Sequence, residues 1–176
     1  IPYFDHFKKV CVIGSGFVAL QAAWAARYRG LDVMVLELMD RIMPSVLDEE
    51  GARLLTEKIR EKGVDLRTGV STQRFEKMDD GTFKIHLVGG EEIEADFVIV
   101  GTGVRSNIRF LKDTDIQTER GILVDSHMRT NIPNIYAAGD VAAGPTTFGD
   151  EHLIHALWPT ACEMGKTAGK NMAGID

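Results

Sequence analysis

The chain has 176 residues, of which 44% are hydrophobic and 26% charged, the composition of an ordinary globular protein. That length allows one large domain or two small ones, with a core that needs neither disulfides nor metals. The net charge of −6 argues against nucleic-acid binding, which relies on clustered Lys and Arg. Because no apolar run approaches the ~18–20 residues of a membrane span and no signal-peptide pattern opens the chain, we expect a cytoplasmic protein with no membrane partner.

The first structured segment is a strand, turn, helix and strand over residues 9–37. Val10–Cys11–Val12–Ile13 is a β-branched apolar run that ends at a glycine-rich turn. Residues 18–29 then carry Ala, Leu and Trp at helical spacing, Gly30 ends the helix, and residues 33–36 form a second apolar run. Because neither run has a polar face, we expect central parallel strands covered by helices.

The next segments extend this sheet and add an antiparallel unit. Residues 47–62 form an amphipathic helical pattern and precede a short strand, Val64–Arg67, which we expect to be a third parallel strand. Asp80–Gly81 and Gly89–Gly90 are hairpin-turn dipeptides that separate three alternating runs, so the sequence predicts an antiparallel β-meander. The runs are 73–78, 83–88 and 91–94, and the unbroken apolar run 97–100 returns to the parallel sheet.

The sequence changes character after Val104. Residues 121–125 form a short apolar segment, residues 134–140 follow the pattern Asn-Ile-Tyr-Ala-Ala-Gly-Asp, and a loop with Gly and Pro is expected up to Asp150. A helix from about Thr160 to Met172 ends the chain. This part has too few regular elements to build a full sheet of its own.

The turn Gly14–Ser15–Gly16–Phe17–Val18–Ala19 has the GxGxxA spacing of a dinucleotide-binding turn. Gly14 permits the tight exit from the strand, and Gly16 has no β-carbon, so a pyrophosphate can approach the start of the helix. There the amides of Phe17 and Val18 are free to bind the anion. Ala19 still allows close packing of helix and strand. The turn therefore predicts a dinucleotide site.

An acidic residue at the end of the second strand supports this prediction. Glu37 lies roughly twenty residues beyond the turn, where a carboxylate accepts hydrogen bonds from the adenosine ribose hydroxyls. The same charge repels a 2′-phosphate and so favours NAD over NADP, although Arg41 nearby leaves NADP open. An alternative hypothesis is a Rossmann methyltransferase, since those proteins also pair a glycine-rich turn with such an acid.

Three motifs resemble the FAD-dependent pyridine nucleotide-disulfide oxidoreductase superfamily across nearly the whole chain. The first is Val12–Ala19 with Glu37 and the segment 39–44, and the second is the strand and glycine turn 98–107. The third, 130–140, is similar to the second FAD motif of the superfamily, which a methyltransferase does not need. The closing stretch 157–174 resembles the branch of NADH oxidases, rubredoxin reductases and nitrite reductases.

This resemblance implies an α/β fold with two parts. Residues 1–104 are expected to form a Rossmann-like NAD(H)-binding domain with a parallel sheet and a β-meander, in which Gly103 lets the chain pass close to the dinucleotide. Residues 105–176 are expected to form the C-terminal half of an FAD-binding domain. The first FAD βαβ unit and the interface domain, which makes the superfamily's dimer contacts, are absent from this sequence.

The resemblance also assigns flavin-binding roles in the second part. Gly139 and Asp140 match the motif in which the aspartate accepts a hydrogen bond from the ribityl chain of FAD. Trp158 stands at a helix start that approaches the flavin in this branch, and its ring either packs over the flavin edge or belongs to the core. Gln21 stands where many relatives carry a glutamate near the nicotinamide, and it brings no charge.

The implied function is an FAD-dependent NADH oxidoreductase that passes electrons from NADH through the flavin to oxygen or to an electron-carrier protein. No residue of the chain is assigned as catalytic and none as a metal ligand, since the flavin does the chemistry. The alternative is a truncated NAD-binding module that cannot retain FAD and has no activity alone. With only Cys11 and Cys162, far apart, a CxxC redox pair is excluded from this sequence.

Several other residues have ordinary structural explanations. Cys11 and Tyr136 lie in apolar runs and are expected in the core. His86 has no neighbour at metal-ligand spacing and is expected to face solvent, while His155 is expected to start the last helix. The acidic run 48–50 is expected to form the first turn of a helix, where the helix dipole favours carboxylates.

Overall fold

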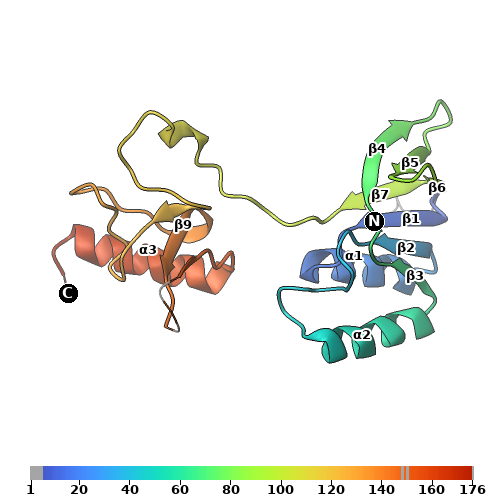
Figure 1. Cartoon of the computed structure of the whole chain (residues 1–176), viewed down its shortest axis with the longest axis horizontal. Helices are drawn as coiled ribbons and strands as arrows, with labels where there is room; N and C mark the ends of the chain where they lie inside the picture. Colours follow the sequence, from blue (N-terminus) through green and yellow to red (C-terminus); the bar gives the residue numbers. More distant parts are fainter. Residues whose placement is uncertain (1–5, 148, 150, 176) are drawn as a thin grey trace. The chain divides into compact units, whose positions relative to one another are not determined.

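The structure is a computed structural model, which describes residues 6–147, 149 and 151–175. The chain divides into two compact units, Ile1–Gly103 and Val104–Asp176. We call them the first and the second unit and describe each by itself (Figure 1). Within the described residues, no helix combines the length and the apolar character that a membrane crossing requires.

A four-stranded parallel sheet forms the centre of the first unit, which confirms the predicted α/β fold. Strand β1 pairs in parallel with β2 on one side and with β7 on the other, and β3 pairs with the far edge of β2. The order is therefore β3-β2-β1-β7. The strands are β1 (Lys9–Ile13), β2 (Asp32–Leu36), β3 (Val64–Arg67) and β7 (Phe97–Val100).

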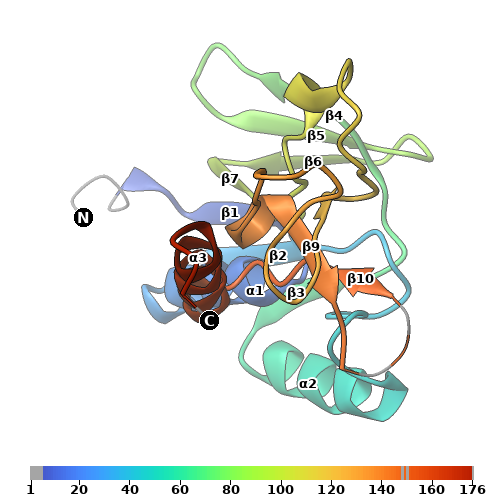
Figure 2. The same ribbon diagram turned by 90° about the vertical axis from the view of Figure 1, so that its left-hand side faces the viewer.

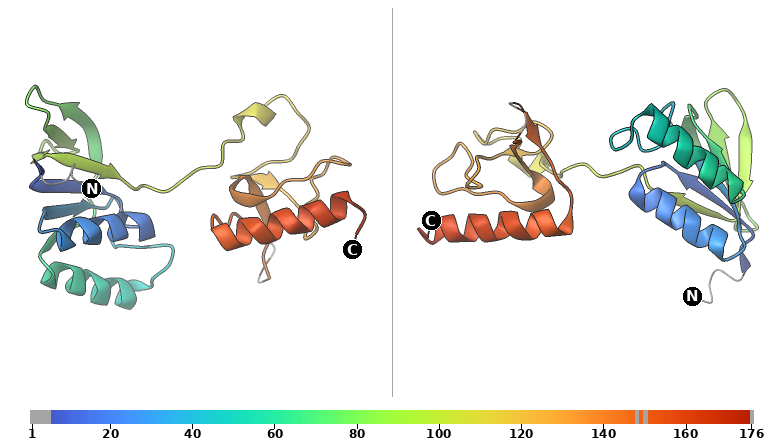
Figure 3. Two further views of the ribbon diagram at one scale, coloured as in Figure 1. Left: turned by 180° about the vertical axis from the view of Figure 1, so that it is seen from behind. Right: turned by 90° about the horizontal axis from the view of Figure 1, so that it is seen from below.

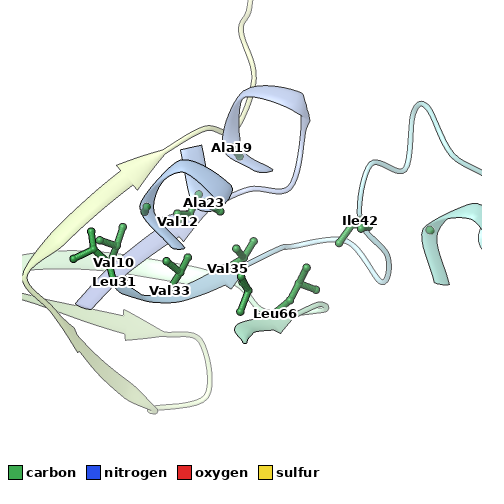
Figure 4. Close-up of a cluster of buried hydrophobic side chains, with 12 residues drawn as sticks. Val10, Val12, Ala19, Ala23, Leu31, Val33, Val35, Ile42 and Leu66 are labelled. Carbon is green, nitrogen blue, oxygen red and sulfur yellow. The ribbon is translucent and has the colours of Figure 1, made fainter. Parts of the chain in front are cut away.

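Two helices cover one face of this sheet, α1 (Phe17–Tyr28) and α2 (Glu49–Glu61) (Figure 1). The side chain of Asp48 accepts a hydrogen bond from the amide of Gly51 at 2.8 Å and caps α2. The acidic run at residues 48–50 is thus a helix start, as predicted. Figure 4 shows the core between helices and sheet, with labelled side chains Val10, Val12, Ala19, Ala23, Leu31, Val33, Val35, Ile42 and Leu66.

The antiparallel meander covers the opposite face of the sheet. It consists of β4 (Thr72–Lys77), β5 (Phe83–Leu87) and β6 (Glu92–Ala95), in the order β4-β5-β6. The expectation that helices cover both faces was therefore wrong, because alternate residues of β5 and β6 supply the second apolar layer. The buried residues of this layer are Cys11, Ile13, Leu36, Ile85, Leu87, Ile93 and Ala95.

His86 on β5 does not face solvent as the sequence predicted. Its side chain is only 13% exposed, with Nε2 3.1 Å from Glu76 on β4 and Nδ1 3.1 Å from Glu92 on β6. This arrangement could not be predicted from the sequence because it depends on the register of three strands, in which His86 stands directly opposite Glu92.

The second unit contains a small sheet and one long helix. Strand β9 (Ala142–Pro145) pairs in parallel with β8 (Ile122–Leu123) and antiparallel with β10 (His152–Leu153), and Figure 2 shows β9 and β10 side by side. Figure 3 shows the helix α3 (Trp158–Met172) running along this unit. Two short 3-10 helices complete it, η2 (Arg109–Leu111) and η3 (Gly139–Val141).

Several expectations for the second unit were wrong. The segment that was predicted as a loop contains β9, and its expected end, Asp150, lies outside the described residues. Tyr136, in contrast, packs half-buried against the core of this unit as expected, and it forms a single bridge with Arg129. His155 is exposed and precedes α3, which begins at Trp158. Trp158 is 83% exposed, so it does not belong to the core.

Candidate functional site

The glycine turn joins three elements at the carboxyl end of the parallel sheet. Gly14 follows β1 with a φ of +97°, and a β-carbon on it would lie 2.5 Å from the carbonyl oxygen of Gly101, which follows β7. A β-carbon on Gly101 would in turn lie 2.8 Å from that of Ala19 on α1. Since β2 and β7 flank β1 on opposite sides, the turn lies where the strand order reverses, the usual ligand position in such sheets.

Gly16 is a glycine for a different reason. Its φ of −72° is accessible to any residue, and a β-carbon built on it meets no other atom within 4 Å. It is the N-cap of α1, and among the described residues no side chain caps the amides that follow it, those of Phe17 and Val18. The chain itself therefore leaves room for an anion at this helix start.

Glu37 lies directly after β2 and is only 8% exposed. Its Oε2 accepts a hydrogen bond from the hydroxyl of Ser15 at 2.5 Å, and its Oε1 accepts one from the amide of Met39 at 2.8 Å. The Ser15 hydroxyl also accepts a hydrogen bond from the amide of Met43 at 3.3 Å. The sequence did not single out Ser15, because its position within the turn has no residue requirement of its own.

One cleft of about 490 Å³ is lined by Gly14, Ser15, Gly16, Glu37 and Met39, together with other residues. Of the residues predicted to bind NAD(H), the structure brings Gly14, Gly16, Glu37 and Gly103 together there, while the side chains of Phe17 and Val18 are exposed on the first turn of α1. The cleft is lined by Ile13, Gly14, Ser15, Gly16, Leu36, Glu37, Leu38, Met39, Pro44, Ser45, Val70, Ser71, Thr72, Gly101, Thr102 and Gly103.

Arg41, the residue that could accommodate the 2′-phosphate of NADP, contacts neighbouring residues of its own loop. Its guanidinium donates to the carbonyl oxygen of Pro44 at 3.4 Å and lies 3.7 Å from the carboxylate of Asp40. It is not among the residues that line the cleft. Gln21 is exposed on α1, and among the described residues no group of three His, Cys, Asp or Glu side chains is placed to hold a metal ion.

The second unit has a cavity of its own, with a volume of about 760 Å³. Asp140 lines it, and the hydroxyl of Ser106 donates to the backbone carbonyl of Asp140 at 2.5 Å. Gly139 has a φ of +78°, and a β-carbon on it would lie 3.7 Å from that of Ala161, so η3 lies against the first turns of α3. Two arginines and a histidine also line this cavity, Arg105, Arg120 and His152.

Comparison with known proteins assigns the chain to a family. The model of the family described as "Pyridine nucleotide-disulphide oxidoreductase" matches residues 2–165. An NADH oxidase from Methanocaldococcus jannaschii is 34% identical over 172 residues, which are 96% of this chain and 38% of that protein. The ferredoxin–NAD(+) reductase component of a p-cumate 2,3-dioxygenase system from Pseudomonas putida is 34% identical over 167 residues, 95% of this chain and 40% of that protein.

Solved structures agree with this assignment. The water-forming NADH oxidase from Lactobacillus brevis, bound to NADH, matches with a TM-score of 0.88 and 29% identity over 97% of this chain and 38% of that one. An engineered variant of it that is a water-forming NADPH oxidase, bound to NADPH, matches with a TM-score of 0.88 and 28% identity over 98% of this chain and 38% of that one. The chain thus spans about two fifths of the length of these relatives. It belongs to the pyridine nucleotide-disulphide oxidoreductase family.

Proposed function

We propose that the chain carries the NADH-binding part of an FAD-dependent NADH oxidoreductase. In this proposal residues 1–104 form the NAD(H)-binding domain and residues 105–176 form the C-terminal half of the FAD-binding domain. The observation that carries the proposal is the cleft of the first unit, in which an uncapped helix start at Gly16 and the buried carboxylate of Glu37 lie together. A dinucleotide needs both features, one for its pyrophosphate and one for its ribose.

The donors and acceptors in the cleft fit this ligand. The amides of Phe17 and Val18 point along the helix start toward an anion beside Gly16. A carboxylate offers about four acceptor positions, and Ser15 and Met39 use one on each oxygen of Glu37. The remaining positions match the two hydroxyls of a ribose.

The engineered relative supports NADH as the preferred nucleotide. Five of its residues are substituted. The first is a glycine, and an aspartate, an alanine and a methionine follow in succession, beginning 18 positions after the glycine. The fifth is a proline five positions after the methionine. Ala19, Glu37, Leu38, Met39 and Pro44 have the same spacing in this chain. The aspartate that the NADPH variant lost corresponds in this spacing to Glu37, so an acid at this position favours a nucleotide without a 2′-phosphate.

The second unit supplies the flavin contacts in this proposal. FAD bound there would supply the redox chemistry, taking up electrons from NADH and passing them on. Asp140, which lines the cavity of this unit, would accept a hydrogen bond from the ribityl chain, and Gly139 would keep the backbone clear beside it. Trp158 is exposed at the start of α3 and would lie against the ring. As the electron acceptor we propose either oxygen or a ferredoxin-type carrier, and the relatives named as a water-forming NADH oxidase and as a ferredoxin–NAD(+) reductase component support this choice.

Calorimetric titration of the chain with NADH tests the proposal. We expect NADH to bind the wild type and Gly16→Ala to raise its Kd at least tenfold, since the new methyl group occupies the anion position. Gly169→Ala on α3 is the matched control, because a β-carbon there also meets nothing within 4 Å. Absence of NADH binding, or a Gly16→Ala chain that binds as the wild type does, would reject the proposal.

A parallel titration with FAD separates the whole oxidoreductase function from the binding module. Retention of stoichiometric FAD that NADH reduces supports the first, and NADH binding without FAD retention supports a module that needs further protein segments. Asp140→Ala is the matching variant, and we expect it to weaken FAD binding and leave NADH binding unchanged, since Asp140 belongs to the second unit.

A further inference from the structure

Two polar side chains of the described residues are buried, Ser15 and Glu37, and they are bonded to each other. Ser15 is 1% exposed, and its hydroxyl donates to Oε2 of Glu37 at 2.5 Å. A hydrogen bond of this length to a carboxylate is charge-assisted and stronger than one between neutral groups. Ser15 is therefore a candidate for a role that its place in the glycine turn does not require.

The bond fixes the carboxylate from a second segment of the chain. The other donor to Glu37 is the amide of Met39, two residues further along the same loop. Ser15 instead belongs to the turn that follows β1. There the amide of Gly14 donates to the carbonyl oxygen of Leu36 at 2.8 Å, and the amide of Gly101 donates to that of Ile13 at 2.8 Å. The Ser15 hydroxyl thus links the carboxylate of Glu37 to the turn that follows β1.

Building on the proposed NADH site, we propose that Ser15 is the positioning residue that aims Glu37 at the adenosine ribose and so sets the preference for NADH over NADPH. With one donor on each oxygen, the carboxylate keeps the orientation in which its free acceptor positions face the cleft. The same fixed charge repels a 2′-phosphate. When Ser15 no longer donates, the carboxylate turns about its side-chain bonds, and both effects weaken together.

Ser15 also has a structural contact, which the test must separate from this role. Its hydroxyl accepts the amide of Met43, a buried residue with a φ of +46°, and this bond holds the loop after β2. If Ser15 had only this structural role, its replacement would raise the Kd for NADH and the Kd for NADPH by the same factor. A positioning Ser15 changes the ratio of the two affinities, because only NADH gains from the aimed carboxylate and only NADPH is rejected by it.

The experiment is a calorimetric titration of wild type, Ser15→Ala, Glu37→Ala and the double variant with NADH and with NADPH. We expect Ser15→Ala to lower the ratio of the Kd for NADPH to the Kd for NADH about tenfold, the effect of losing one charge-assisted hydrogen bond. In the Glu37→Ala background the same substitution leaves this ratio unchanged, because Ser15 acts through Glu37. Ser126→Ala, on an exposed turn of the second unit, is the control and keeps the wild-type ratio.

The outcomes distinguish this inference from the proposed function. A wild type that binds no NADH overturns both. A wild type that binds NADH, with an unchanged ratio in Ser15→Ala, overturns the positioning role alone, as does a ratio that still falls in the Glu37→Ala background. If Ser15→Ala does not fold, Ser15→Cys takes its place, since a thiol fills nearly the same volume but donates only weakly, and the same fall in the ratio is expected.

Discussion

The α-carbon of Gly14 lies so close to the carbonyl oxygen of Gly101 that a β-carbon on Gly14 would stand 2.5 Å from it. This approach brings together the ends of the two neighbouring strands β1 and β7 at the bottom of the cleft. Gly16, two residues further, makes no such approach and has an ordinary backbone conformation. The two glycines of the turn thus serve the fold and the ligand separately.

This separation predicts effects of different size on stability for two similar substitutions. Gly14→Ala puts a methyl group against a backbone oxygen at a φ of +97°, and we expect it to lower the free energy of unfolding by about 3 kcal/mol. Gly16→Ala collides with nothing and should lower that free energy by only about 1 kcal/mol, because Gly is a better N-cap residue than Ala. Urea unfolding followed by circular dichroism measures both.

The control for Gly14 is Gly81→Ala in the turn between β4 and β5. Gly81 has a φ of +89° but open space around it, so its substitution tests the backbone strain without the collision, and we expect a loss of about 1 kcal/mol. Equal losses at Gly14 and Gly81 would show that the approach to Gly101 contributes nothing.

A second prediction concerns the choice of nucleotide. Glu37→Ala combined with Leu38→Arg removes the carboxylate and adds a cation at an exposed position that lines the cleft. We expect the preference to move toward NADPH by about a hundredfold in the ratio of Kd values, since one repulsive charge is lost and one attractive charge gained. Titration with both nucleotides measures it. Leu38→Arg alone retains Glu37 and should move the ratio far less.

The parallel sheet of the first unit could be predicted from sequence because its signals are local. Apolar runs without a polar face mark β1 and β7, and the turn dipeptide Asp80–Gly81 marks a hairpin whose strands form as expected. The sequence did not show which elements cover each face of the parallel sheet. Helices and a meander both present apolar side chains at regular spacing, and only the packing of Ile85 and Ile93 onto Cys11 decides between them.

The second unit was predicted less well, for a reason visible in β9. Ala142–Pro145 contains no β-branched residue, so its strand conformation depends on pairing with β8 and on the burial of Ala142 in the core of this unit.

In the cleft of the first unit, Gly14, Gly16 and Glu37 could be predicted from the spacing of the motif. Ser15 did not, because a hydroxyl has no sequence pattern and acquires its role only from the acceptor that the fold places beside it.

A third prediction follows from Asp96, between β6 and β7. Its Oδ2 accepts hydrogen bonds from the amides of Lys9 at 2.8 Å and Lys8 at 2.6 Å, and these bonds lower the pKa of the carboxyl below its ordinary value of 3.8. A lowered pKa in the folded state stabilises the protein above pH 3.8, and this stabilisation is lost as the pH falls through the folded-state value.

Asp96→Asn keeps an acceptor but not the charge. We expect it to cost about 1 kcal/mol at pH 7 and less at pH 3, because below pH 3.8 the carboxyl of the unfolded chain takes up a proton and the stabilising effect of the lowered pKa declines. Urea unfolding at the two pH values measures the difference, with the exposed Asp113→Asn as a control. A cost that does not shrink at pH 3 would mean that the charge of Asp96 is not what holds the start of β1.

The two cysteines give the last prediction. Cys11 is buried between the parallel sheet and the meander, and burial raises the pKa of its thiol to about 12, while Cys162 is exposed on α3. Because the thiolate is the reactive form, a chromogenic disulfide reagent at pH 8 should label one thiol per folded chain and two after unfolding in urea. Cys162→Ser should reduce the folded count to zero. Rapid labelling of Cys11 in the folded chain would instead show that the meander opens from the sheet, since no thiolate forms at Cys11 while that face is covered.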